Sequence, residues 1–209
     1  AHIALLIGGE RQQQFLKQIG LFDPSPVELI EAPYAKPIVP KRWPDITTIT
    51  VSYGHGIAAS PLALATAYAT IANGGIKVTP TLLKRTEPME GERIMRPETA
   101  AEAVKMLRRV VTEGTASLGE VPGYQVAGKT GTAEKPNPQG GYYNDRVVNT
   151  FAAVFPADNP RYVLTVTLDE PVETTGPKPR RTAGWTAVPV AAEIIRRAAP
   201  LLGLKPQVD

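Results

Sequence analysis

Apolar positions in the first half of the chain recur mainly at helical spacing, with a proline-rich interruption. Residues 1–19 predict a helix, and residues 24–44, which hold six prolines, predict an extended and irregular segment. The stretch Ile46–Ile76 carries no formal charge and predicts a strand followed by a buried helix. That helix is expected over residues 61–72, with Ser60 as its N-cap, and is apolar on nearly every side.

The second half of the chain changes from helical spacing to strand-like runs. A helix with one apolar stripe is expected over residues 97–114, and strands are expected over residues 124–132, 147–155 and 162–168. The link between the last two strands is short, so they form an antiparallel hairpin. A closing helix over residues 188–199 covers the sheet. This order predicts an α+β fold with an antiparallel sheet flanked by helices.

Composition narrows the class of protein. With 209 residues, 43 % of them hydrophobic, the chain is long enough to bury a core and is neither a disordered tail nor a coiled coil. It has no cysteine, which excludes a disulfide framework and a thiol nucleophile. Its two histidines lack spaced carboxylate partners, so we expect no metal and no cofactor. A net charge of +3 with 6 % aromatic residues does not favour nucleic acid as a partner.

The segment with the most specific chemistry is Gly128-Lys129-Thr130-Gly131-Thr132, and it fits two patterns. Residues 123–130 match the phosphate-loop pattern G-x-x-x-x-G-K-T, which requires a helix directly after the motif. The glycine- and proline-rich run that follows here does not start a helix. The second pattern is the K-T-G motif of penicillin-recognising serine acyltransferases, in which the motif lies on an edge strand beside the active site.

The residue types of this segment suit recognition of a carboxylate and stabilisation of an oxyanion. The Lys129 ammonium supplies positive charge for a substrate carboxylate and for proton movement. The hydroxyls of Thr130 and Thr132 donate hydrogen bonds, and the Thr132 backbone N–H can point at a developing oxyanion. Gly131 has no side chain and lets a substrate lie close against the strand. The purely structural alternative is an edge strand with a solvated lysine and two β-branched threonines.

Longer stretches in the same order along the chain carry a family resemblance. The chain resembles the second half of the transpeptidase domain of class B penicillin-binding proteins, the division-type peptidoglycan D,D-transpeptidases. The resemblance implies the penicillin-binding protein/β-lactamase-like transpeptidase fold. The matching stretches are residues 49–56, 60–75, 126–133, 151–156, 162–171 and 187–195.

The resemblance also implies a serine nucleophile that lies outside these residues. The family's nucleophile belongs to an S-x-x-K motif, and a second catalytic motif is S-x-N. The resemblance places both motifs before Ala1. We therefore expect residues 1–209 to be the C-terminal portion of a single transpeptidase domain that cannot acylate alone, with the helix over residues 62–72 packing against the missing N-terminal half. Neither motif occurs at any of the four serines, Ser25, Ser52, Ser60 and Ser117.

By the same resemblance, the parent protein cross-links peptidoglycan stem peptides by acyl transfer, and β-lactams are its inhibitors. Lys129 and Thr132 are the catalytic residues of this segment, while Thr130, Gly131, Thr132 and Tyr142 bind substrate. An anchor outside the chain is expected to hold it at the periplasmic face of the inner membrane, near membrane proteins of the division machinery. The alternatives are a non-catalytic interaction or sensor module of the same fold, and a D,D-carboxypeptidase or β-lactamase.

Overall fold

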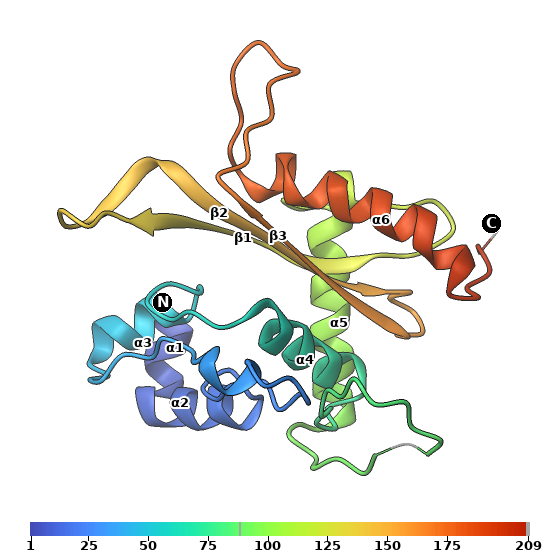
Figure 1. Ribbon diagram of the computed structural model, residues 1–209, viewed down its shortest axis with the longest axis horizontal. Coiled ribbons are helices and arrows are strands. Elements are labelled where there is room, and N and C mark those ends of the chain that lie inside the picture. Colours follow the sequence, from blue (N-terminus) through green and yellow to red (C-terminus); the bar gives the residue numbers. More distant parts are fainter. Residues whose placement is uncertain (88, 208–209) are drawn as a thin grey trace. The chain divides into compact units, whose positions relative to one another are not determined.

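The computed structural model describes residues 1–87 and 89–207, and the chain divides into two compact units, Ala1–Arg96 and Pro97–Asp209. The first unit is helical and irregular, whereas the second contains the sheet (Figure 1).

Three short helices of the first unit pack together. They are α1 (His2–Ile7), α2 (Gly9–Gln18) and α3 (Asp45–Val51). The sequence predicted one continuous helix over residues 1–19, which is wrong. Gly8 has a φ of 83°, a left-handed conformation that only glycine adopts readily, and it redirects the chain between α1 and α2.

The strand predicted at the start of Ile46–Ile76 is also wrong, because those residues form α3. Their β-branched side chains favour a strand locally. In the folded unit, however, α3 buries Thr48 and Val51 on one face, and Gln12 of α2 donates from Nε2 to the Thr48 carbonyl at 3.1 Å. These contacts between helices override the local preference.

The next helix, α4 (Pro61–Ala72), confirms the prediction at this position. The Ser60 hydroxyl accepts a hydrogen bond from the Ala63 N–H at 3.1 Å and caps the first turn. One face of the helix is buried at Ala63, Ala67 and Thr70, while 40 % of Leu62 is exposed. The proline-rich segment before it is irregular, as expected, apart from the 3₁₀ helix η1 (Ala32–Tyr34).

The second unit is built on a three-stranded antiparallel sheet in the order β1–β2–β3. The strands are β1 (Ala127–Pro136), β2 (Tyr142–Phe155) and β3 (Tyr162–Asp169). Helix α5 (Pro97–Thr112) packs against β1, with Ala100, Val104 and Val111 buried along its predicted stripe. The predicted strands and hairpin are confirmed, although the first strand begins at Ala127 rather than at Tyr124. β1 is an edge strand, as the K-T-G interpretation requires.

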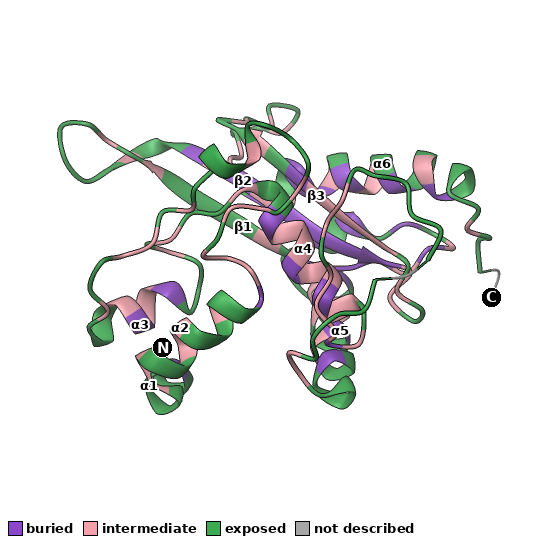
Figure 2. Cartoon of the chain, turned by 60° about the horizontal axis from the view of Figure 1, so that its bottom comes forward, coloured by how far each residue is buried: buried purple, intermediate pink, exposed green. Residues whose placement is uncertain are grey.

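Helix α6 (Ala187–Leu201) covers one face of this sheet (Figure 1). Val188, Ala191 and Ile195 recur at helical spacing, are fully buried, and belong to the same core cluster as Phe151 of β2. Figure 2 shows this buried side of α6 and the buried middle of the sheet. The 3₁₀ helices η2 (Ser117–Gly119) and η3 (Ala183–Trp185) lie before β1 and before α6, and they contact each other.

The β1–β2 hairpin is longer than the sequence predicted. Strand pairing continues past Val147 as far as Tyr142, which lies opposite Pro136. The glycine-rich segment between the two strands therefore forms only a short turn, in which Gly140 and Gly141 have positive φ values of 108° and 72°. A bulge between Glu134 and Pro136 marks the outer part of the hairpin.

Candidate active site

The residues of the K-T-G segment lie in the middle of β1, where the pairing with β2 is regular. Lys129 lies opposite Ala152, Thr130 opposite Phe151, and Thr132 opposite Asn149. Because side chains alternate along a strand, Thr130 and Thr132 share the face that α6 covers, and Lys129 and Gly131 share the other. The strand thus holds both hydroxyls on one side, one pleat apart.

The strand's pairing also decides where the Thr132 backbone N–H points. Residues of β2 with odd numbers bond to β3, since the Val147 carbonyl accepts from the Glu170 N–H at 2.9 Å. The even-numbered residues of β2 therefore bond to β1, and the register gives them odd-numbered partners there. Thr130 and Thr132 consequently direct their backbone groups to the free edge. In agreement, the Thr130 carbonyl accepts from Lys129 Nζ at 2.9 Å.

Hydrogen bonds hold the two threonine hydroxyls in place. Thr130 Oγ1 lies 2.7 Å from Thr115 Oγ1 and 3.4 Å from Lys129 Nζ. Thr132 Oγ1 accepts from the Ala183 N–H at 3.0 Å. Because that bond occupies a lone pair, the Thr132 proton remains available for donation to a ligand. An ammonium and two oriented hydroxyls at a strand edge form a suitable site for a carboxylate.

A groove of about 450 Å³ lies over these hydroxyls within the second unit. Sequence reasoning identified only the two threonines of β1 among its lining residues. The other walls come from the end of α5 and from η2 and η3, which patterns along the chain do not place beside a strand. The groove is lined by Gly114, Thr115, Ser117, Leu118, Thr130, Thr132, Thr182, Ala183, Gly184 and Trp185.

Asn149 is a second residue that the sequence reasoning missed. It is fully buried, and its Nδ2 donates to the Arg181 carbonyl and to Thr186 Oγ1, both at 2.7 Å. These bonds fix the segment that forms one wall of the groove against β2. The signal was present in the sequence, because Asn149 is a polar residue in phase with Phe151 and Ala153 on the core face of a predicted strand.

Two glycines of β1 have different surroundings. A Cβ added at Gly128 would lie 2.6 Å from both the Ala152 carbonyl oxygen and Phe151 Cζ, so this glycine is required by packing. A Cβ added at Gly131 would meet nothing closer than 3.8 Å. Packing therefore does not require glycine at Gly131, and the predicted role of this residue in admitting a substrate stays a prediction.

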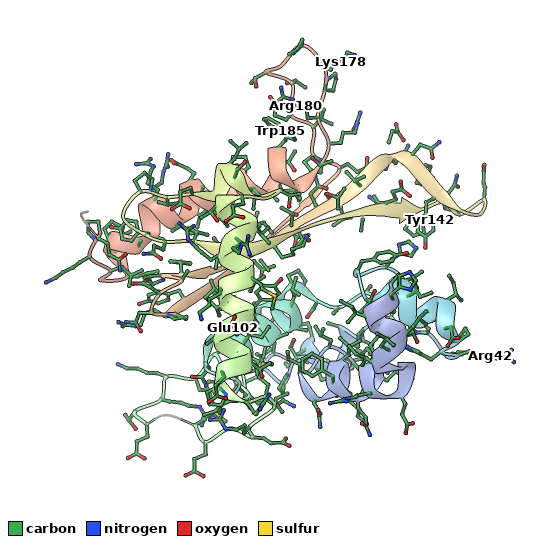
Figure 3. All side chains as sticks on the ribbon, turned by 180° about the vertical axis from the view of Figure 1, so that it is seen from behind. Arg42, Glu102, Tyr142, Lys178, Arg180 and Trp185 are labelled. Carbon is green, nitrogen blue, oxygen red and sulfur yellow. The ribbon has the colours of Figure 1, made fainter. Side chains whose placement is uncertain are left out.

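Tyr142, the remaining predicted substrate-binding residue, lies at the outer part of the hairpin (Figure 3). It pairs with Pro136, four residues beyond Thr132, which is about 13 Å along the strand. Within the second unit the structure brings Lys129, Thr130 and Thr132 together and leaves Tyr142 apart from them. Its role in substrate binding remains a prediction.

The connection from β3 to α6 carries several charged groups. It begins at Asp169 and Glu170, whose carboxylates bind Lys135 Nζ at 2.9 and 2.8 Å. Further along, hydrogen bonds from Thr175 and the positive charge of Arg180 lower the pKa of Glu173. The Arg180 guanidinium lies over the Trp185 ring, 3.7 Å from its centroid. The hydrogen bonds that Lys135 Nζ donates, chiefly to Glu170 and then to Asp169, raise the pKa of Lys135.

The conformation after Lys129-Thr130 tests the phosphate-loop alternative. A phosphate loop requires a helix after Lys129-Thr130, but β1 continues to Pro136, so that alternative is excluded. Among residues 1–87 and 89–207, no cluster of three histidine, aspartate or glutamate side chains is arranged to hold a metal ion. In the same residues, no helix is both long and apolar enough to cross a membrane.

Comparison with known proteins identifies the family to which this fold and edge-strand site belong. The family model of the penicillin binding protein transpeptidase domain matches residues 1–196, and the chain belongs to this family. The probable peptidoglycan D,D-transpeptidase FtsI of Caulobacter vibrioides is 40 % identical over 220 residues, covering all of this chain and 37 % of the relative. PbpB of Mycobacterium tuberculosis is 34 % identical over 91 % of the chain and 31 % of its own length.

Solved structures agree with this assignment. The TP domain of penicillin-binding protein 3 from Burkholderia pseudomallei superposes with a TM-score of 0.88 at 33 % identity, over all of this chain and 62 % of that one. Penicillin-binding protein 3 of Mycobacterium tuberculosis, in complex with ampicillin, superposes with a TM-score of 0.85 at 30 % identity, over all of this chain and 49 % of that one. The expected fold and the division-type resemblance are thus confirmed. The chain spans between 31 % and 37 % of the length of the two curated relatives named above.

Proposed function

We propose that this chain forms the substrate-carboxylate side of a serine D,D-transpeptidase, which cross-links peptidoglycan stem peptides and is acylated by β-lactams. The observation that carries the proposal is the arrangement on β1. There an ammonium, two hydrogen-bonded hydroxyls and an edge-facing backbone N–H lie within four consecutive residues, Lys129–Thr132. Relatives named as D,D-transpeptidases, and a similar structure in complex with ampicillin, support the substrate class.

In this mechanism the ligand lies along the free edge of β1. Its terminal carboxylate accepts hydrogen bonds from Thr130 and Thr132 in the field of the Lys129 ammonium. The carbonyl under attack lies at the Thr132 N–H, which stabilises the negative charge that develops on its oxygen. A serine hydroxyl adds to that carbonyl and the terminal residue leaves as an amine. An amine of a neighbouring strand then takes the acyl group from the serine.

The nucleophile belongs to motifs that these 209 residues do not contain. We assign the S-x-x-K serine and the S-x-N motif to a segment before Ala1. Lys129 then faces the S-x-N group across the cleft and assists proton movement. A protein with this activity carries a membrane anchor and works on the periplasmic face of the inner membrane, with division proteins as its neighbours.

Labelling with a fluorescent penicillin tests the site assignment in the protein that includes the preceding segment. Thr130→Val and Thr132→Val each remove one hydroxyl donor to a charged group and keep the shape of the side chain. Each should slow acylation by roughly 10–100-fold. Thr167→Val is the matched control, because Thr167 lies on β3 and makes a similar hydroxyl contact with Thr150 at 3.2 Å outside the groove. Unimpaired acylation in both β1 variants would refute the site.

A non-catalytic interaction or sensor module of the same fold is the second candidate. The observation that keeps it open is the sequence itself, in which none of the four serines is followed by the nucleophile pattern. Reading the coding sequence upstream of Ala1 separates the two candidates. An S-x-x-K followed by an S-x-N supports the enzyme, and the absence of both supports the module.

A further inference from the structure

A cation that the mechanism above does not use lies against one of the residues that line the groove. Arg180 lies in the connection between β3 and α6, and its guanidinium stacks on the ring of Trp185, a residue that lines the groove. Figure 3 shows Arg180 close to Trp185, with Lys178 further out at the end of the same connection. The structure thus holds a positive charge directly behind one wall of the groove.

The packing around Arg180 restricts the guanidinium to one orientation. Trp185 supports one face at 3.7 Å, and on another side Gly176 leaves the room it needs, since a Cβ there would lie 3.0 Å from Arg180 Nη2. Glu173 Oε2, which is buried, forms an ion pair with Arg180 Nε at 3.9 Å, a distance too long for a hydrogen bond. A stacked guanidinium keeps its N–H groups directed outward in its own plane, which suits two parallel hydrogen bonds to a carboxylate.

These donors are available to a ligand. Within residues 1–87 and 89–207 the Arg180 guanidinium donates no hydrogen bond, although it is only 36 % exposed. Glu173, the nearby carboxylate, is 18 % exposed, and its Oε1 already accepts from the N–H and the hydroxyl of Thr175. An anion that approaches from solvent therefore meets the more exposed cation rather than the carboxylate.

The direction of the ligand along β1 decides which part of it meets this cation, and this step rests on the proposed function. The ligand carboxylate lies at Lys129 and Thr130, and its reacting carbonyl lies at Thr132. The acyl portion of the ligand therefore continues beyond Thr132. At that point the Ala183 N–H binds Thr132 Oγ1, so the acyl portion passes the segment that ends at Trp185.

We propose that Arg180 is a specificity-determining residue that binds a carboxylate on the acyl side of the ligand. The substrate class is an acyl donor with two anionic groups, one beyond the bond that breaks and one on the acyl portion. An acyl donor whose second group is neutral, such as an amide, lacks the partner of the guanidinium. Arg180 takes no part in bond breaking, so its effect depends on the ligand.

Two penicillins that differ by one carboxylate test this assignment: benzylpenicillin and its α-carboxy derivative. The measurement is the acylation rate constant for each, in the protein that includes the preceding segment, and the reported quantity is the ratio of the two. Arg180→Ala should lower the ratio of carboxylated to uncarboxylated rate by about tenfold, the effect of one charged hydrogen-bonding pair in a partly exposed position. A general loss of protein stability lowers the acylation rate constants of both penicillins equally, so it cancels in their ratio.

Lys178→Ala is the matched control, since it removes the same charge from the same connection but does not touch the Trp185 stack. Its ratio should stay within about twofold of the wild type. Arg180→Lys keeps the charge and loses the planar stack, so its ratio should lie between those of Arg180→Ala and the wild type. An unchanged ratio in Arg180→Ala, or an equal fall in Lys178→Ala, overturns the role of Arg180 and leaves the proposed function intact. Failure of both penicillins to label the wild type overturns both.

Discussion

Replacing each of two glycines of β1 by alanine separates packing from ligand binding. Neither Gly128 nor Gly131 has a positive φ, so backbone strain does not distinguish them. In Gly128→Ala the new methyl carbon would lie 2.6 Å from the Ala152 carbonyl oxygen and from Phe151 Cζ, whereas ordinary contact begins near 3.4 Å. Both neighbours must retreat by about 0.8 Å, and one of them is main chain inside the sheet.

Overpacking of this kind costs about 3 kcal/mol, at the upper end of the usual range, because the carbonyl and the buried ring cannot move independently. For a cooperative unit of about 150–250 residues, that cost lowers the Tm by roughly 6–12 °C, and a larger unit shifts by less. The same methyl at Gly131 meets nothing closer than 3.8 Å, and alanine stiffens a strand relative to glycine, so Gly131→Ala should raise the Tm by about 1–3 °C.

The assays are thermal unfolding by circular dichroism and acylation by a fluorescent penicillin, both on the protein that includes the preceding segment. Gly131→Ala should fold normally and acylate slowly, because its methyl group projects from the Lys129 face of β1, next to the edge along which the ligand lies. Gly128→Ala should lose stability. Equal Tm values for the two variants would refute the packing argument, and normal acylation by a stable Gly131→Ala would remove Gly131 from the substrate site.

Three further outcomes are expected. Ser60→Ala removes the N-cap of α4, costs about 1 kcal/mol, and should speed amide hydrogen exchange in the first turn of that helix. Asn149→Ala removes two buried hydrogen bonds and should lower the free energy of unfolding by about 3 kcal/mol in denaturant titrations. Hydrogen bonds from Arg196 and then Arg197 lower the pKa of Glu193 from 4.5 to about 2. The stabilisation from the contacts of Glu193 with these arginines is therefore full above pH 4.5 and is lost as the pH falls towards 2. NMR titration should show a higher Glu193 pKa when both Arg196 and Arg197 are replaced by Gln.

The parts of the molecule that the sequence determined are those in which neighbours along the chain decide the conformation. The capped helix α4, the stripe of α5, the β2–β3 hairpin and the K-T-G strand all follow from local periodicity and turn residues. The same reasoning failed at Gly8, where one glycine in a left-handed conformation divides a periodic helix. It failed again at α3, where packing against Gln12 outweighs a preference for strand.

Only the tertiary structure decided the rest of the site. The sequence identified Lys129, Thr130 and Thr132, because their chemistry is concentrated in adjacent positions. It did not identify Thr115, Asn149 or the stacked Arg180–Trp185 pair. Thr115 and Trp185 both line the groove, although along the sequence Thr115 lies 15 residues before Thr130 and Trp185 lies 53 residues after Thr132. Contacts over such separations depend on how helices and strands pack, and no local pattern of residues encodes them.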